Sequence, residues 1–150
     1  MESGKDGKNE LIGKCVEFFN EDYNCCESVL LSSAGLLGVD CDIIPKIASP
    51  FGGGICQRKH MCGALSGAVM ALGLKYGRNT AVDDREPSYS RAGTIVEKFV
   101  EKYGSANCID IIGYDPKDPD KIIRDKQHIR ATICSPLIRQ VAEWLWEELE

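Results

Sequence analysis

No apolar run in this sequence is long enough to cross a membrane. The longest predominantly apolar stretch lies within Ala64–Leu74, whereas a membrane-spanning helix needs about 20 such residues. The first ten residues, MESGKDGKNE, lack the apolar core of a secretory signal. These two absences predict a protein that does not insert into a membrane and that is located in the cytoplasm.

Basic residues are fewer than acidic residues in this sequence. The chain holds 18 Lys and Arg against 23 Asp and Glu, which gives a net charge of −5 and an isoelectric point near 5.1. Nucleic acids and anionic membranes attract basic surfaces. The composition therefore excludes nucleic acid and anionic membrane as the expected main partners.

The common short cysteine motifs are missing, although the chain has eight cysteines. There is no Cys-x-x-Cys pair, as in zinc ribbons or thioredoxin motifs, and no Cys-x-x-Cys-His for covalent haem. A cytoplasmic chain is not expected to hold a disulfide framework, because that compartment keeps thiols reduced. We therefore expect the cysteines to include metal ligands, redox thiols and ordinary core residues.

Strand-like alternation of apolar and polar residues is also missing, and helical periodicity takes its place. With 150 residues, 43% of them apolar, the chain has the size and the apolar content of one domain. We expect a flexible N-terminus over residues 1–8 and a single all-α, cysteine-rich domain over residues 9–150, folded as a compact bundle of five to seven helices. Besides a central helix after Cys62, the predicted helical segments are 9–20, 24 to 35 or 38, 42–48, 88–103, 118–130 and 135 onward.

The stretch Phe51–Gly77 is the most unusual part of the sequence. It begins with three consecutive glycines at 52–54, which predict a tight turn because glycine adopts positive φ without steric cost. In the helix that follows, Gly63, Gly67 and Ala71 recur every four residues and therefore share one face. A face without side chains indicates that another backbone packs closely against this helix.

Four of the eight cysteines stand at a predicted helix start. They are Cys25 after the cap residue Asn24, Cys62 before the central helix, Cys108 after Asn107, which is predicted to cap a short helical turn reaching Gly113, and Cys134 before Ser135 and Pro136. Asn24 and Glu27 have the spacing of a capping box. Unpaired N–H groups and the positive dipole end at a helix start favour a thiolate and lower its pKa. Convergence of the four helix starts would therefore form a pocket of clustered thiolates.

A cluster of four thiolates is typical of several kinds of site. It can bind an iron–sulfur cluster or a structural zinc ion, and it can equally form two redox dithiols. The turn formed by Gly52, Gly53 and Gly54 and the nearby thiol of Cys56 are predicted to lie beside the bound group. His60 is a candidate substitute ligand.

The other cysteines are expected to lie outside the site. Cys15 falls within an apolar helical stripe and is predicted to be a small core residue, and Cys41 is predicted to be an incidental surface thiol. Cys25 and Cys26 cannot easily bridge each other, because adjacent Cα atoms are about 3.8 Å apart. Neighbours on a helix also point about 100° apart, so only one of these two faces a given site.

These motifs resemble those of the C_GCAxxG_C_C family of redox-active proteins. The residues that carry the resemblance are Asn24-Cys25, the triple glycine, Cys62-Gly63-Ala64-x-x-Gly67, Asn107-Cys108 and the late Cys134. Their order and spacing cover nearly the whole chain from Tyr23 to the last helix. The chain departs from the family pattern at Cys56, where glycine is common, and around Lys59 and His60.

The resemblance implies a redox domain in which Cys25, Cys62, Cys108 and Cys134 are the family's four cysteines. It also implies similarity to the cysteine-bearing part of split-Soret cytochromes, where a non-haem iron–sulfur centre is associated with such cysteines. The expected function is then electron transfer or redox sensing, or an oxidoreductase activity. The protein would hold a [2Fe–2S] cluster on these cysteines and exchange electrons with a separate redox partner protein. The resemblance does not imply a haem group in this protein, because the chain lacks the haem-attachment motif.

Two alternatives of other kinds remain open. One is a metal-free protein that cycles disulfides, with Cys25 or Cys62 as the low-pKa attacking thiol. The other is a structural zinc-binding module that interacts with a partner. A homodimer is a further expectation, because Trp144 and Trp146 cannot both face the core, so one of them marks a packing or dimer surface.

Overall fold

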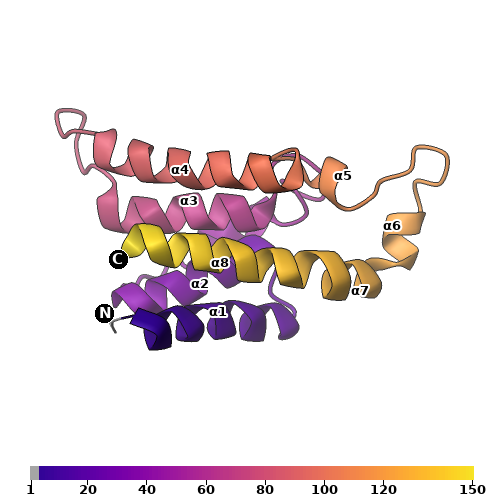
Figure 1. Ribbon diagram of the computed structural model, residues 1–150, viewed down its shortest axis with the longest axis horizontal. Helices are drawn as coiled ribbons and strands as arrows, with labels where there is room; N and C mark the ends of the chain where they lie inside the picture. Colours follow the sequence, from indigo (N-terminus) through magenta and orange to yellow (C-terminus); the bar gives the residue numbers. More distant parts are fainter. Residues whose placement is uncertain (1–3) are drawn as a thin grey trace.

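The computed structural model describes residues 4–150 and consists of helices packed side by side (Figure 1). Five long helices form its body: α1 (Gly4–Asn20), α2 (Cys25–Leu37), α3 (Gly63–Tyr76), α4 (Glu86–Tyr103) and α8 (Ser135–Leu149). The described residues contain no β-strand and only one isolated β-bridge, so the predicted all-α class is confirmed.

Shorter helical elements connect the long helices. They are the 3₁₀ helix η1 (Lys46–Phe51), the single turns α5 (Cys108–Ile111), α6 (Lys121–Arg124) and α7 (Lys126–Ile129), and the π-helical segment η2 (Arg130–Cys134). Residues 4–150 thus contain eight α-helices, against five to seven predicted. The excess arises because three of the eight are only four residues long.

The predicted helix over residues 42–48 is wrong. Residues 42–45 form turns, and the 3₁₀ helix η1 begins only at Lys46. Pro45 precedes η1 and Pro50 lies inside it. Because proline has no N–H to donate, two prolines five residues apart prevent a regular α-helical ladder here.

The C-terminal third is also divided differently from the prediction. The predicted helix over 118–130 is interrupted at Asp125, which has φ −96° and ψ 15°. Beyond it, α7, η2 and α8 follow one another with helical backbone angles at Arg130, Cys134 and Ser135. The helix α8 does begin at Ser135, as predicted, but the π-helical segment η2 leads directly into it, so this start is not a free helix end.

The first helix begins at Gly4, five residues before the predicted start at Asn9. Residues 4–8, predicted to be flexible, belong to α1, while residues 1–3 lie outside the described part. Gly7 is buried, and the Lys8 ammonium lies 3.0 Å from the carboxylate of Glu143 on α8. These contacts with the bundle stabilise the first turns of α1, which lie before the apolar stripe of the helix.

The closest helix pair is α2 and α3, as the small-residue face predicted. A Cβ on Gly67 would lie 2.9 Å from the carbonyl oxygen of Cys26 and 3.0 Å from Cβ of Val29. Real Cβ atoms almost never approach other atoms so closely, so only glycine permits this spacing. The core around this contact is continuous across the long helices and includes Leu11, Cys15, Phe19, Leu65, Leu72, Ile95, Phe99, Ile138, Val141 and Leu145.

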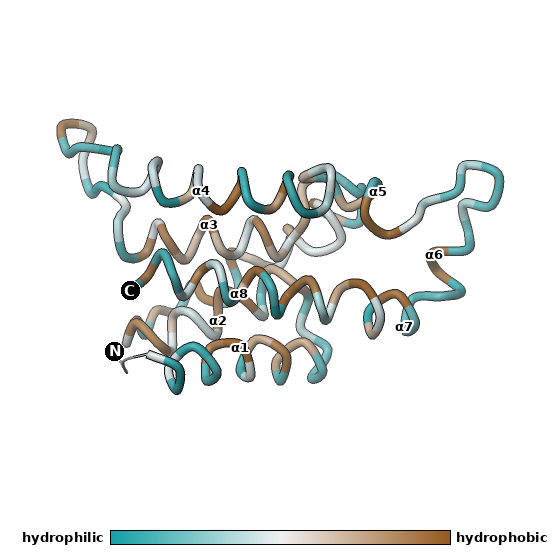
Figure 2. Tube along the Cα trace, viewed as in Figure 1, coloured by the Kyte–Doolittle hydropathy of each residue, from teal (hydrophilic) through white to brown (hydrophobic). Residues whose placement is uncertain are grey.

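Both described ends of the chain lie at one end of the bundle in Figure 1, and α5, α6 and α7 lie at the other. The helices α2 and α3 start at that second end, so Cys25 and Cys62 reach the region of α5 and α7. The helix α7 is mostly hydrophilic, and apolar residues recur from its end through η2 into α8 (Figure 2). No helix within residues 4–150 combines the length and hydropathy of a membrane span.

Candidate functional site

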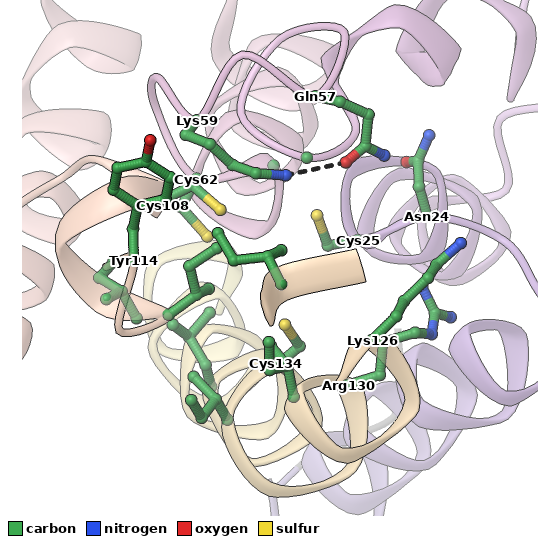
Figure 3. Close-up of a pocket in the computed structure, with 18 of the residues that line it drawn as sticks. Asn24, Cys25, Gln57, Lys59, Cys62, Cys108, Tyr114, Lys126, Arg130 and Cys134 are labelled. Atoms are coloured by element: carbon green, nitrogen blue, oxygen red, sulfur yellow. Dashed lines mark hydrogen bonds between the residues drawn. The ribbon is translucent and has the colours of Figure 1, made fainter. Parts of the chain in front are cut away.

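A cavity of about 620 Å³ lies where these elements meet. Four cysteines line it, namely Cys25, Cys62, Cys108 and Cys134, each from a different part of the chain. Figure 3 shows the four sulfurs turned toward the same space. The structure thus brings together the four cysteines that the sequence singled out.

Cys25 is positioned by the start of α2. The Asn24 side chain accepts a 2.9 Å hydrogen bond from the Glu27 N–H, and the Glu27 carboxylate accepts one of 2.9 Å from the Asn24 N–H. This is the predicted capping box, and it fixes the first helical turn. Gly63 of α3 leaves the space that the Cys25 sulfur occupies, since a Cβ there would collide with it.

Cys62 and Cys108 are held side by side by backbone pairing. The N–H of Cys62 donates to the carbonyl of Ala106 at 2.9 Å, and the N–H of Cys108 donates to the carbonyl of His60 at 2.7 Å. Met61 and Asn107 form the isolated antiparallel bridge between these bonds. Asn107 makes no side-chain cap to α5, contrary to the prediction, so the bridge rather than a cap positions Cys108.

Cys134 reaches the cavity from the end of the π-helical segment η2. Its backbone is helical, with φ −68° and ψ −44°, and helical residues precede it. Cys134 does stand directly before α8, as predicted, but because η2 precedes it, no free N–H groups of a first turn stabilise its thiolate. Single π-helical turns are rare and often lie at functional sites.

The glycine turn continues into a left-handed segment. Gly53 and Gly54 have φ of 65° and 74°, and Ile55, Cys56, Gln57 and Lys59 also have positive φ, between 52° and 64°. Left-handed backbone costs roughly 1–2 kcal/mol for each residue that has a Cβ. Such strain often marks a functional site, and here it directs Gln57 and Lys59 into the cavity wall.

Two cations lie near the thiols, and the sequence reasoning did not identify either of them. The Lys59 ammonium favours the thiolates of Cys108 and Cys134, and the Arg130 guanidinium favours those of Cys25 and Cys134. Arg130 precedes Cys134 by four residues, a helical spacing that could have revealed it. Lys59 carries no comparable signal, because only the left-handed turn places it here.

Burial raises the pKa values of the site cysteines. It is the largest effect on Cys25, Cys62, Cys108 and Cys134, and with all effects together the pKa of Cys134 is about 12. Repulsion from the Cys25 thiolate raises the last three further. The predicted lowering of the pKa at the Cys25 and Cys62 helix starts is therefore wrong: nearby N–H groups do lower these pKa values, but desolvation outweighs them.

The remaining predicted site residues lie at the edge of the cavity or away from it. Gly53 lines it, whereas Gly52 packs against the Asn24 side chain and Gly54 against the His60 backbone. Cys56 and His60 are both exposed, and neither of them lines the cavity.

The other three cysteines lie outside the cavity. As predicted, Cys15 is buried in the core and Cys41 is exposed. Cys26 is buried in a separate apolar cluster with Leu30 and Ala48, while its neighbour Cys25 faces the cavity. Only one of the two adjacent cysteines therefore faces the cavity, as helix geometry predicted.

Four thiols are the donor complement of both an iron–sulfur cluster and a structural zinc ion. Within residues 4–150, no three His, Cys, Asp or Glu side chains are grouped closely enough to hold one metal ion. A zinc ion would need four sulfurs at about 2.3 Å from one point. An iron–sulfur cluster would distribute its cysteine ligands over more than one iron, so those four sulfurs would not need to meet at a single point.

Fold and site together define an all-α protein built around a four-cysteine cavity. The chain belongs to the family described as "Putative redox-active protein (C_GCAxxG_C_C)", whose model matches residues 23–148. It is also similar to an uncharacterized protein of Archaeoglobus fulgidus, with 33% identity over 108 residues, or 65% of this chain and 71% of that protein. No solved structure matches the chain.

Proposed function

We propose that this protein holds an iron–sulfur cluster, of the [2Fe–2S] type, on Cys25, Cys62, Cys108 and Cys134, and that it serves in electron transfer or redox sensing. The observation that supports this proposal most directly is the convergence of four thiols from four elements on one cavity. Membership of a family described as redox-active agrees with it. A redox partner protein exchanges the electrons, and the reducing cytoplasm keeps the thiols available.

Each part of the site has a role in this proposal. When bound, the cluster supplies a one-electron redox couple. The four cysteines provide thiolate ligands, and the charges of Lys59 and Arg130 offset part of the negative charge that the ligands gather. The apolar wall formed by Ile133, Leu137 and Ile138 limits the access of water.

The arrangement of Cys62 and Cys108 favours one alternative function. These cysteines are linked through the bridge between Met61 and Asn107, and their sulfurs lie next to each other in Figure 3. In a metal-free protein, the two thiols could lose two protons and two electrons to an acceptor and form a disulfide. The raised thiol pKa values work against rapid attack by either one at neutral pH.

The test of the cluster is anaerobic purification and reconstitution, followed by visible spectroscopy and by analysis of iron, sulfide and zinc. Serine variants of Cys25, Cys62, Cys108 and Cys134 are each expected to lose iron. Cys15→Ser and Cys41→Ser are the matched controls and are expected to retain it. Iron that is absent from the parent, or bound equally by all six variants, would contradict the proposal.

The same material tests the disulfide alternative. After mild oxidation of the metal-free protein, peptide mapping would find the Cys62–Cys108 disulfide if this pair is the redox unit. A stable cluster with no such disulfide under air-free conditions supports the iron–sulfur proposal instead. Zinc without iron in the purified protein would favour the structural module.

A further inference from the structure

The cavity contains more space than a cluster on the thiols can fill. Its volume of about 620 Å³ corresponds to roughly 20 water molecules at about 30 Å³ each, and lies within the roughly 300–1,000 Å³ of small-molecule sites. A [2Fe–2S] cluster adds only four atoms. Because residues at its rim are exposed, the cavity is open to the solvent, and the space beside the thiols is accessible to a second occupant.

Apart from the thiols, most of the cavity lining is apolar. Seven isoleucines contribute to it, namely Ile111, Ile112, Ile122, Ile123, Ile129, Ile133 and Ile138. Isoleucine offers no metal ligand and no hydrogen bond, so this part of the cavity suits an apolar molecular body. Its rim is apolar too: Ile123 is 74% exposed and Tyr114 is 36% exposed, and both line the cavity.

The charged groups of the cavity are all cationic. Lys59, Lys126 and Arg130 line it, and no Asp or Glu does, although the chain has 23 acidic residues and a net charge of −5. This local excess of positive charge opposes the sign of the whole protein. It favours a ligand that carries a negative group.

One of these cations has no partner within the described residues. Lys59 donates to Gln57 at 3.0 Å, and Arg130 donates to the carbonyls of Phe19 and Tyr23 at 2.8 and 3.3 Å. Lys126 has neither an ion pair nor a side-chain hydrogen bond among residues 4–150. Figure 3 shows it in the wall that also carries Arg130. Its ammonium is free to bind an acidic group of a ligand.

We infer that the isoleucine-lined part of the cavity binds a small organic anion, whose apolar body contacts the isoleucines and whose acidic group pairs with Lys126. The inference goes beyond the proposed redox centre and does not require that the cysteines hold a cluster. In the four-cysteine cavity, such a ligand lies beside the thiols, where a substrate or effector of a redox centre would be placed.

The test uses two fluorescent probes on the full-length protein. One is 1-anilinonaphthalene-8-sulfonate, which is an apolar body with an anionic group, and the other is N-phenyl-1-naphthylamine, its neutral counterpart. Saturable binding of one sulfonate probe per chain is expected, with an affinity at least five-fold above that of the neutral probe. Lys126→Gln should weaken binding of the sulfonate at least five-fold and leave the neutral probe unchanged.

Two further variants complete this experiment. Lys121→Gln alters a nearby exposed lysine outside the cavity and should change neither affinity. Ile123→Asn should weaken both probes, and because Ile123 is 74% exposed the variant is expected to fold. Circular dichroism of each variant must match that of the parent, since loosened proteins also bind these dyes.

Two results would overturn the inference: absence of saturable binding to the folded parent, or equal sulfonate affinity for the parent and Lys126→Gln. The Cys25→Ser variant separates this inference from the redox proposal. It is expected to lose iron and to keep sulfonate binding. Iron binding by the parent without sulfonate binding would refute the ligand site alone, and sulfonate binding without iron would refute the cluster alone.

Discussion

The Cys25 thiol lies directly against Gly63, so that a single methyl group on α3 would occupy the place of the sulfur. The same position would also bring that methyl to 3.1 Å from the Phe51 carbonyl oxygen and 3.2 Å from the Cys26 nitrogen. One glycine therefore serves both the contact between two helices and the placement of a site cysteine. This coupling gives the first prediction.

Gly63→Ala should reduce stability and disturb the site. The added methyl displaces the Cys25 sulfur, and overpacking of this kind typically costs about 1–3 kcal/mol. Urea denaturation measures the loss, and iron content after anaerobic reconstitution measures the effect on the site. Gly73→Ala in the same helix is the control: nothing lies within 4 Å of its added Cβ, so it should stabilise by about 0.5–1 kcal/mol through helix propensity. Similar gains in both variants would show that the Gly63 contact is not tight.

Gly67→Leu should destabilise more than Gly63→Ala. Its side chain meets the Cys26 carbonyl and the α2 backbone, which cannot rotate away as a cysteine side chain can. We expect a loss of at least about 3 kcal/mol, measured from the urea midpoint with the slope held constant. Gly13→Leu, on an exposed face of α1 with nothing within 4 Å, should raise the midpoint slightly, because leucine has a higher helix propensity than glycine. An unchanged midpoint for Gly67→Leu would mean that α2 and α3 are not in close contact.

Asn24→Ala should weaken the start of α2 by about 1 kcal/mol, the usual cost of losing an N-cap. The side-chain nitrogen of Asn24 also donates a 3.0 Å hydrogen bond to the Ser49 carbonyl, so the variant loses a hydrogen bond to η1 as well. Asn24→Asp keeps the oxygen that accepts from Glu27 and should lose less. Thermal denaturation of the three proteins tests this order. Equal melting temperatures for the parent and Asn24→Ala would show that the capping box contributes nothing.

Stability at high pH should depend on Cys15. Burial raises the pKa of this thiol from 9.0 to about 12. Below pH 9 the Cys15 thiol keeps its proton in both the folded and the unfolded chain, so the buried neutral thiol contributes its full share to stability. Between pH 9 and 12 the unfolded thiol ionises while the folded one does not, so the free energy of unfolding falls with rising pH.

Cys15→Ala removes the thiol and with it this pH dependence. Above pH 9, the free energy of unfolding of the variant should fall less steeply with pH than that of the parent, by about 1.4 kcal/mol per pH unit. Urea titrations at pH 8.0, 9.5 and 10.5 give the two slopes. Cys41→Ala is the control, because Cys41 is exposed, and its slope should equal that of the parent. Parallel slopes for Cys15→Ala and the parent would contradict the assignment of a neutral buried thiol.

Local patterns in the sequence were enough to find several features of the site. The spacing of Asn24 and Glu27 gave the capping box, and the four-residue recurrence of Gly63 and Gly67 gave the close helix pair. The four-cysteine pattern, read together with the family resemblance, identified Cys25, Cys62, Cys108 and Cys134, which the structure places around one cavity. Such predictions succeed because caps and helix faces depend on residues within one or two turns.

Other features required segments that are far apart in the sequence. Cys108 stands beside Cys62 through pairing of two loop segments rather than through a helix cap. Cys134 lies directly before α8, but η2 leads into that helix without a free end. The thiol pKa values also differ from expectation, because the local effect of a helix start favours the thiolate while burial by distant elements opposes it.

The sequence by itself determined the helical class, the faces that pack in the core and the four cysteines that line the cavity. The first two properties follow from periodicity and from local hydrogen bonding, and the third from the cysteine pattern read with the family resemblance. The tertiary structure alone decided that the cysteines share their cavity with seven isoleucines and with Lys59, Lys126 and Arg130. A cavity wall is assembled from residues whose only relation is proximity in space, and the electrostatic state of each thiol depends on how far that assembly excludes water.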